Sequence, residues 1–358
     1  MTLQAAPTPA NALLVLEKDQ NTLVIVDPAS LTVVARVPVG DNPHEVAVSD
    51  DGKTAYISNY GGNTIAVVDL VAQKPLPAID LGALRAPHGL EFVGGKLYFT
   101  AEGAKVVGRF DPATKKIDWV IGTGQDRTHM VIVTKDLKTV LTSNVSSGTI
   151  SLIGQVAPGQ GRGPGGGPPG GGPGPGGPGG PQPGRGGPGG PGGGPGGRGG
   201  PPPGGPGGGP DWEVTNIPVG HGSEGFDLTP DGKELWVANA NDHTISIIDL
   251  ASKKVVQELP STGNANRLKI TLDGKYAFVS DLGGTDLLIV DVATREAYKT
   301  IKTGGSTEGL LMSPDGKHVY TTLNDRDSVA VVDLKTFAVT GEVKTGRGPD
   351  GLAWASRK

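Results

Sequence analysis

Of the 358 residues, 61 are glycine and 31 are proline, and the excess over a globular composition lies in residues 158–210, where 31 Gly, 17 Pro, three Arg and two Gln fill every position. The rest of the chain carries 29 Lys and Arg against 36 Asp and Glu, a negative balance that argues against nucleic acid or an anionic membrane as the main partner. There is no cysteine, which excludes disulfides, thiolate metal sites and a cysteine nucleophile.

The N-terminal segment, residues 1–10, is rich in Ala and Pro and has neither a basic region nor an apolar stretch. We therefore expect a flexible N-terminus that is not a signal peptide. No apolar run further along approaches the roughly 20 residues of a membrane-spanning helix, so no membrane span is expected. The acidic, cysteine-free composition favours a periplasmic or secreted protein.

A repeat of 42 residues runs through the chain. Its clearest mark is a short apolar phrase ending in Asp, which reads TIAVVD at 64–69, TISIID at 244–249 and SVAVVD at 328–333. The closing Asp recurs 42 residues apart at positions 27, 69 and 111 and again at 249, 291 and 333. One more copy, TISLI at 149–153, falls in the gap once residues 158–210 are set aside. Seven units account for nearly the whole chain, and this period is typical of propeller blades.

Each unit contains four apolar runs of period two separated by turn residues, which predicts four short antiparallel strands, A to D. In the second unit we expect strand A at 45–49, B at 54–58, C at 64–69 and D ending near 82. The chain starts in a strand B and ends with a lone strand A at 351–355, so one sheet combines both termini and closes the ring. The sequence therefore predicts an all-β fold, a single seven-bladed β-propeller over residues 11–357.

Residues 158–210 interrupt the hairpin between strands C and D of one unit. They contain no apolar side chain, so burial cannot offset the entropy of ordering them. Glycine does not keep the every-third-residue register of collagen for long. We therefore predict a disordered insert, which is either a flexible tether or an evolutionary expansion.

One position at the entrance to strand A carries the sharpest functional signal. In a propeller the D–A loops surround the mouth of the central channel, on the face opposite the A–B turns. Aligned on the A–B turns and on the closing Asp, this position holds three of the six histidines in successive units, and carboxylates in three of the other four. We call the set the mouth ring; it consists of His44, His88, His129, Glu224, Asn266, Glu308 and Asp350.

The ring suggests two kinds of chemistry. Imidazoles that converge from neighbouring blades are ligands for Zn, Fe, Cu or Ni, so we predict a divalent metal site at His44, His88 and His129. A histidine beside a carboxylate, such as His129 with Glu224 or His44 with Asp350, is a candidate catalytic acid–base pair.

The remaining ring residues are candidate ligand contacts. Glu224, Asn266, Glu308 and Asp350 would bind a small molecule, and the nearby arginines at 85, 127 and 347 would attract an anion. The alternative is that each ring side chain is duplicated loop chemistry that caps its own turn. We assign that simpler role to a second polar set, which opens the B–C loops and consists of Glu17, Asn59, Asn144, Asn239 and Asp281.

Several phrases of the repeat are similar to a known family. SEG at 223–225, TPDGK at 229–233 and LWVAN at 235–239 resemble the YVTN-type propeller repeat of bacterial YncE-like proteins. The resemblance implies the fold. The broader superfamily includes lactonases, a streptogramin lyase, d1-haem-binding domains and surface-layer modules, so the resemblance does not imply one activity. We expect a monomeric scaffold that binds a small molecule or a protein at the mouth. The alternative is a metal-assisted lyase or lactone hydrolase that uses the histidine sector.

Overall fold

The computed structural model describes residues 6–157 and 211–357. The predicted disordered insert and residues 1–5 of the predicted flexible N-terminus lie outside the described residues. Within that terminus, Thr8 is buried and donates a hydrogen bond to the Leu70 carbonyl. The chain separates into a propeller unit, residues 1–154 and 214–358, and a second unit, residues 155–213. Everything that follows about cores and sites concerns the propeller unit.

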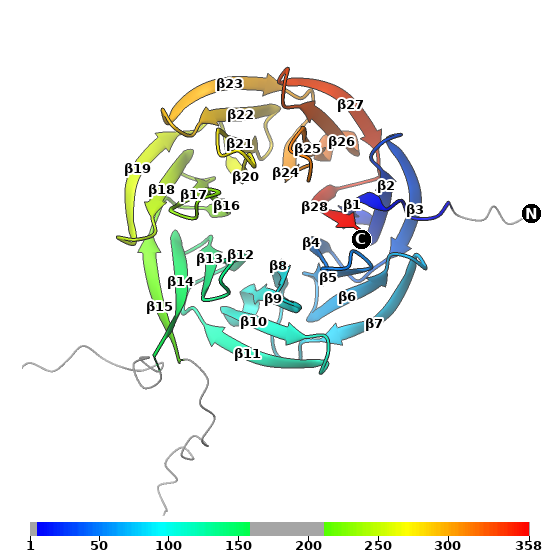
Figure 1. The fold of residues 1–358 in the computed structure, drawn as a ribbon, viewed down its shortest axis with the longest axis horizontal. Coiled ribbons are helices and arrows are strands. Elements are labelled where there is room, and N and C mark those ends of the chain that lie inside the picture. Colours follow the sequence, from blue (N-terminus) through cyan, green and yellow to red (C-terminus); the bar gives the residue numbers. More distant parts are fainter. Residues whose placement is uncertain (1–5, 158–210, 358) are drawn as a thin grey trace, which may run out of the picture. The chain divides into compact units, whose positions relative to one another are not determined.

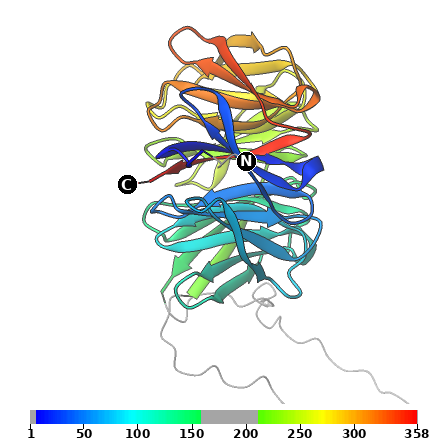
Figure 2. The ribbon, with the colours of Figure 1, turned by 90° about the vertical axis from the view of Figure 1, so that its right-hand side faces the viewer.

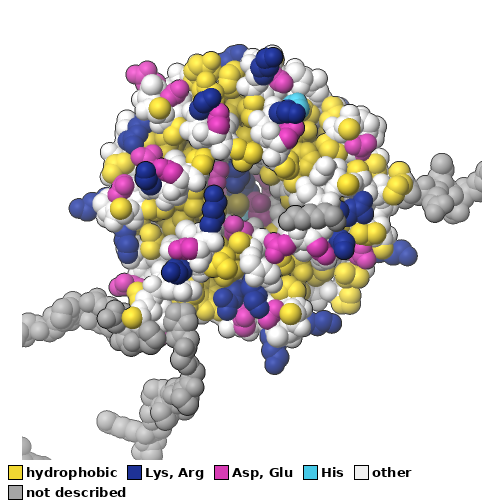
Figure 3. Space-filling model, in the orientation of Figure 1, with side chains coloured by type: hydrophobic (Ala, Val, Ile, Leu, Met, Phe, Trp, Pro, Cys, Tyr) yellow, Lys and Arg dark blue, Asp and Glu magenta, His cyan; other side chains and the backbone are white. Residues whose placement is uncertain are grey.

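Within the described residues, seven four-stranded antiparallel sheets are arranged as blades around a common axis, and strand A of each blade is innermost (Figure 1). Figure 2 shows the ring of blades edge-on. The predicted seven-bladed, all-β fold is therefore confirmed. Figure 3 shows that the centre of one face is hollowed and that acidic and basic side chains line the hollow. The helices of the described residues are three short 3-10 segments, none of which could cross a membrane, namely η1 (Lys18–Gln20), η2 (Glu102–Ala104) and η3 (Asn324–Arg326).

The first four blades contain the following strands, given from the inside outward. Blade 1 is β28 (Pro349–Ser356), β1 (Asn11–Glu17), β2 (Thr22–Asp27) and β3 (Thr32–Pro38). Blade 2 is β4 (Pro43–Val48), β5 (Thr54–Asn59), β6 (Thr64–Asp69) and β7 (Lys74–Asp80). Blade 3 is β8 (Pro87–Val93), β9 (Lys96–Ala101), β10 (Val106–Asp111) and β11 (Lys116–Gly122). Blade 4 is β12 (Thr128–Val133), β13 (Thr139–Asn144), β14 (Thr149–Val156) and β15 (Asp211–Pro218).

The other three blades follow the same order. Blade 5 is β16 (Ser223–Leu228), β17 (Glu234–Asn239), β18 (Thr244–Asp249) and β19 (Lys254–Pro260). Blade 6 is β20 (Ala265–Ile270), β21 (Tyr276–Asp281), β22 (Asp286–Asp291) and β23 (Glu296–Lys302). Blade 7 is β24 (Thr307–Met312), β25 (His318–Leu323), β26 (Ser328–Asp333) and β27 (Ala338–Lys344).

The ring closes through blade 1, as the sequence predicted. The C-terminal strand β28 pairs antiparallel with β1, with Leu13 opposite Trp354 and Leu14 opposite Ala353. Because the first and last strands share one sheet, the ring of blades has no open break at which another chain could add a strand.

The hydrophobic cores lie between neighbouring blades. For example, Trp236 of blade 5 is fully buried in one cluster with Ala277 and Val279 of blade 6. Strands B and C are buried on both faces because a blade lies on either side, whereas the outermost strand D is mostly exposed, as in β7. The fold thus packs sheet on sheet around a circle.

Every strand A contains a β-bulge near its start. In blade 2, Pro43 pairs with Asn59 and Val46 with Ile57, so His44 and Glu45 together oppose Ser58. The same two-for-one register shift occurs in the other six blades. A bulge turns a side chain out of the regular alternation, and its first position in each blade is the mouth-ring residue.

The second bulge position is glycine in four blades, at 89, 225, 309 and 351. A side chain at Gly309 would overlap the carbonyl oxygen of Asp350, and one at Gly351 would overlap that of His44. Glycine is therefore required where the strands A of two neighbouring blades approach each other most closely. Blades 2, 4 and 6 carry Glu45, Met130 and Arg267 in this position instead.

Hydroxyl groups of strand B hold the bulges of neighbouring blades in register. Ser143 accepts a hydrogen bond from the Met130 amide (3.2 Å) and donates one to the Glu224 carbonyl of the next blade (2.7 Å). Ser280 makes the same two bonds to Arg267 and Glu308. These bonds fix the backbone of the ring residues, which pre-organises the mouth.

Further along strand A, Glu91 of β8 accepts a hydrogen bond from the backbone amide of Val133 in the next blade. Burial raises the pKa of Glu91 to about 7, although the hydrogen bond from Val133 opposes the shift. The ordinary value is 4.5. The folded protein therefore binds a proton at Glu91 more tightly than the unfolded chain does.

We expect Glu91→Gln to stabilise the protein at pH 8 by on the order of 1–3 kcal/mol and to have little effect at pH 5. Because the pKa of Glu91 is higher in the folded state, its contribution to stability falls as pH rises from 4.5 to about 7, and glutamine removes this loss. Urea unfolding of both proteins at the two pH values measures the effect. A stability difference that is the same at pH 5 and pH 8 would contradict this assignment.

Candidate functional site

The seven ring residues lie at equivalent bulge positions, and the histidine sector converges. The ring centroids of His44 and His88 are 5.0 Å apart, and those of His88 and His129 are 3.7 Å apart. Both His88 and His129 are buried. Imidazoles from three successive blades therefore form one stack at the mouth.

His129 lies between two carboxylates. Its Nδ1 is 2.5 Å from Glu102 Oε1, and its Nε2 is 2.7 Å from Glu224 Oε2. Burial by itself lowers the pKa of His129, but the charge on Glu224 and the hydrogen bond with Glu102 outweigh it and raise the pKa. Burial likewise opposes ionisation of Glu224, yet His129 lowers the pKa of Glu224 to about 2. The two carboxylates thus favour the protonated, positively charged form of His129.

His88 is in the opposite state. Burial, and next the positive charge of His129, lower its pKa well below the ordinary value. Its Nδ1 is buried and has no hydrogen-bond partner among the described residues. Since buried polar atoms are nearly always paired, this nitrogen is an available ligand atom.

Glu102 begins η2, directly after strand β9. Its Oε2 accepts a hydrogen bond from the Tyr60 hydroxyl (2.7 Å) and lies 3.4 Å from Arg127 Nε. Its other oxygen, Oε1, is left facing His129. Within the described residues, His88, Glu102 and His129 form a group whose ligand atoms all lie within 4.8 Å of one another.

His44 is not a member of that group, and the metal site predicted at His44, His88 and His129 stays a prediction. The Nδ1 of His44 lies 3.0 Å from the Asn42 carbonyl oxygen in its own loop, and its ring packs against Tyr60 with centroids 4.8 Å apart. The imidazole is thus directed back toward its loop, and Glu102 takes the third position.

The acidic sector of the ring is held by a lysine. Lys18 Nζ, from η1, lies 2.6 Å from Glu308 Oε1 and 3.2 Å from Asp350 Oδ2. The other oxygen of Glu308 accepts a hydrogen bond from Asn324 (2.7 Å). Asp350 therefore pairs with Lys18 rather than with the predicted partner His44.

Arg267 crosses the channel. Its guanidinium is 2.5 Å from Glu45 Oε1 of blade 2 and 3.2 Å from Met130 Sδ of blade 4. Its side chain and that of Glu45 are 11% and 13% exposed. The contact joins three blades that are not neighbours and narrows the channel beside the mouth ring.

The remaining residues predicted to contact a ligand do not all lie at the mouth. Asn266 is buried at its ring position, and Arg127 pairs with Glu102. Arg85 and Arg347 are exposed. The arginines predicted to attract an anion therefore do not converge on one point, and the one at the mouth is already paired with a carboxylate.

Comparison with known proteins fits this geometry. The family model for YNCE-like beta-propellers matches residues 209–313. Over these residues the chain is similar to YncE-like β-propellers. No curated protein matches the sequence. The matched residues hold Glu224, Asn266 and Glu308, whereas the histidine sector lies outside them.

Solved structures share the fold at low sequence identity. A protein of unknown function from Desulfotomaculum acetoxidans is 10% identical, with 97% of this chain and 100% of that chain covered and a TM-score of 0.71. A protein from Bacteroides uniformis, provisionally described as a 6-phosphogluconolactonase, is 13% identical over 96% and 99% of the chains, with a TM-score of 0.68. Hydrazine synthase of Kuenenia stuttgartiensis is 18% identical over 86% and 88%, with a TM-score of 0.62. These likenesses concern the fold alone.

Sequence reasoning missed four residues of the site. Each is the first residue after a strand B and reaches a ring side chain: Lys18, Tyr60, Glu102 and Asn324. The same 42-residue spacing relates positions 18, 60 and 102, so the signal was present one residue beyond the polar set assigned to turns. Asn59 of that set does bind within its turn, because it donates to Thr64 Oγ1 (2.9 Å).

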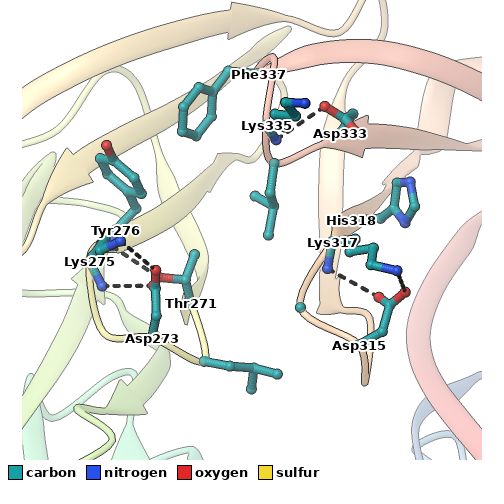
Figure 4. Close-up of a pocket in the computed structure, with 13 residues that line it drawn as sticks. Thr271, Asp273, Lys275, Tyr276, Asp315, Lys317, His318, Asp333, Lys335 and Phe337 are labelled. Carbon is teal, nitrogen blue, oxygen red and sulfur yellow. Dashed lines mark hydrogen bonds and ion pairs between the residues drawn. The ribbon is translucent and has the colours of Figure 1, made fainter.

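A second hollow, of about 710 Å³, lies between the turns of blades 6 and 7 (Figure 4). Its three aspartates each accept a hydrogen bond from the backbone of their own turn, at Lys275, Lys317 and Lys335. The Lys275 and Lys317 side chains are 70% and 72% exposed. Because its polar groups serve turns or face solvent, we place the candidate site at the mouth instead.

Proposed function

We propose that this propeller is a binding module that holds a small, positively charged ligand at the mouth of the channel. The observation that carries the proposal is an excess of buried negative charge. Against the cations Lys18, Arg127, Arg267 and protonated His129 stand five carboxylates, those of Glu45, Glu102, Glu224, Glu308 and Asp350.

Burial disfavours the ionised form of two of these carboxylates. Burial and the neighbouring charge of Asp350 raise the pKa of Glu308 although Lys18 opposes the shift, and burial raises the pKa of Glu45 against the effect of Arg267. A ligand cation would stabilise the ionised form of both groups. The bulges and the hydroxyl bonds support the proposal further, because a pre-organised site loses little entropy on binding.

The test uses three organic cations, choline, putrescine and spermidine, as probes of the purified protein. We expect at least one to raise the melting temperature, and Glu308→Gln to weaken its binding by about tenfold, since one charge contact at a part-buried site contributes on the order of 1–2 kcal/mol. Glu296→Gln, at an exposed position of β23, is the matched control and should bind as the wild type does. Either the absence of binding by all three probes or unchanged binding in Glu308→Gln would refute the proposal.

A metal-assisted lyase or lactone hydrolase is the second candidate. It is favoured by the 2.7 Å contact between His129 Nε2 and Glu224 Oε2, which is the reach of an acid–base pair. We rank it second because both ring nitrogens of His129 already contact carboxylates. A monomeric state and a periplasmic or secreted location stay predictions.

A further inference from the structure

We propose that the histidine sector holds a divalent transition-metal ion of the zinc type, with His88 Nδ1, His129 Nδ1 and Glu102 Oε1 as its ligands. This inference rests on the proposed binding role of the mouth. Its three ligands do not include Glu308, the residue that the organic-cation test alters, so the two can fail separately.

The ligand atoms are close to the required arrangement. Zinc binds imidazole nitrogen and carboxylate oxygen at about 2.0–2.2 Å, which sets ligand atoms about 3.3 Å apart in a tetrahedral site. Those of His88, Glu102 and His129 lie within 4.8 Å of one another, and His129 Nδ1 is 2.5 Å from Glu102 Oε1. To admit an ion, His129 Nδ1 and Glu102 Oε1 would have to move apart by less than about 1 Å, from 2.5 Å to about 3.3 Å.

The free nitrogen of His88 points to a missing partner. Its Nδ1 is buried and unpartnered, in a side chain that is only 2% exposed and packs at 3.7 Å between centroids against the His129 ring. Within the described residues, no protein group bonds to His88 Nδ1. An ion bound by Glu102 and His129 would supply the missing partner.

The surrounding contacts are those of a metal site. Metal-bound histidines usually donate their second N–H to a carboxylate, which orients the ring. Glu224 lies on the Nε2 of His129 at 2.7 Å and can take this part. Tyr60 and Arg127 hold the second oxygen of Glu102, which leaves the first oxygen for the ion.

The carboxylates of Glu102 and Glu224 offset the charge of the ion. With two neutral imidazoles, these carboxylates supply two negative charges against the two positive charges of the ion, and Arg127 remains as a cation beside Glu102. Binding displaces the proton that His129 shares with Glu102, and this proton passes to solvent. Two histidines with one carboxylate leave a fourth position open, and this ligand set is typical of zinc and ferrous iron.

The experiment titrates chelator-treated protein with Zn²⁺ by calorimetry and with Co²⁺ by visible absorption. We expect one equivalent of each metal to bind the wild type. Glu102→Gln should weaken metal affinity at least about tenfold. Replacing a residue that only orients a metal ligand already lowers the affinity by about this factor. Glutamine keeps the shape of the side chain, so Glu102→Gln tests the charge and not the packing. His88→Ala should likewise lose the bound ion.

His221→Ala is the matched control, because the His221 side chain is 76% exposed and lies 3.1 Å from a carboxylate of Asp242. It should keep wild-type affinity. Lack of binding by the wild type, or equal affinity in folded Glu102→Gln and His88→Ala, would overturn the inference. If the metal binds and the organic cations do not, only the proposed function fails; if the organic cations bind and the metal does not, only this inference fails.

Discussion

Arg267→Met will destabilise the protein by roughly 3–5 kcal/mol, the usual cost of removing one partner of a buried ion pair. The guanidinium lies 2.5 Å from Glu45 and 3.9 Å from Asp350, and all three side chains are at most 13% exposed. Its loss removes the cation that lies beside Glu45, whereas Asp350 keeps its contact with Lys18. Urea unfolding at pH 7 measures the change.

The double variant Arg267→Met, Glu45→Gln is the control for this result. Replacing both partners of a buried pair by uncharged groups is often close to neutral, so the second change should recover most of the lost stability. If Arg267→Met is as stable as the wild type, or if the double variant is no more stable than Arg267→Met, the contact across the channel does not stabilise the fold.

Gly309→Ala will destabilise the protein by on the order of 3 kcal/mol, at the upper end of what one extra carbon costs in a filled site. The new methyl group would overlap the carbonyl oxygen of Asp350, a backbone atom of the neighbouring blade, and would lie 3.1 Å from Thr322 Oγ1. Because that oxygen belongs to the main chain, the methyl group cannot be accommodated by a change of rotamer. The two innermost strands must move apart, which shifts Glu308 and Asp350 at the mouth.

Gly62→Ala is the matched control, because a Cβ atom there meets nothing within 4 Å. Thermal unfolding should show a large loss for Gly309→Ala and little change for Gly62→Ala. Similar melting temperatures for the two variants would mean that the close approach of the strands at the bulge is not required.

The two results together test how the ring of blades is held at its centre. The glycines allow the inner strands to come close, and Arg267 connects three blades across the opening. Both features adjoin the mouth ring in sequence, since they occupy the second position of the same bulges. Substitutions there should therefore alter ligand or metal binding as well as stability.

The repeat, the number of blades and the way the ring closes can all be predicted from the amino-acid sequence. These features depend on local patterns, because the alternation of apolar residues, the turn residues and the 42-residue spacing are all properties of one unit. The same spacing placed His44, His88 and His129 at one level around the channel. The polar set read from the B–C loops ended at Glu17, one residue before Lys18, so Lys18 was not assigned to the site.

Which of these side chains meet depends on the folded ring and could not be predicted from the repeat. His44 turns back to its own loop, Glu102 replaces it beside His129, and Arg267 reaches Glu45 from a blade that is not its neighbour. A one-residue bulge sets where each side chain points, and the curvature of the closed ring sets which opposite blades come within reach. The contacts between blades depend on how all seven units are arranged in the ring. A pattern that recurs in every unit therefore cannot predict a contact that occurs only once.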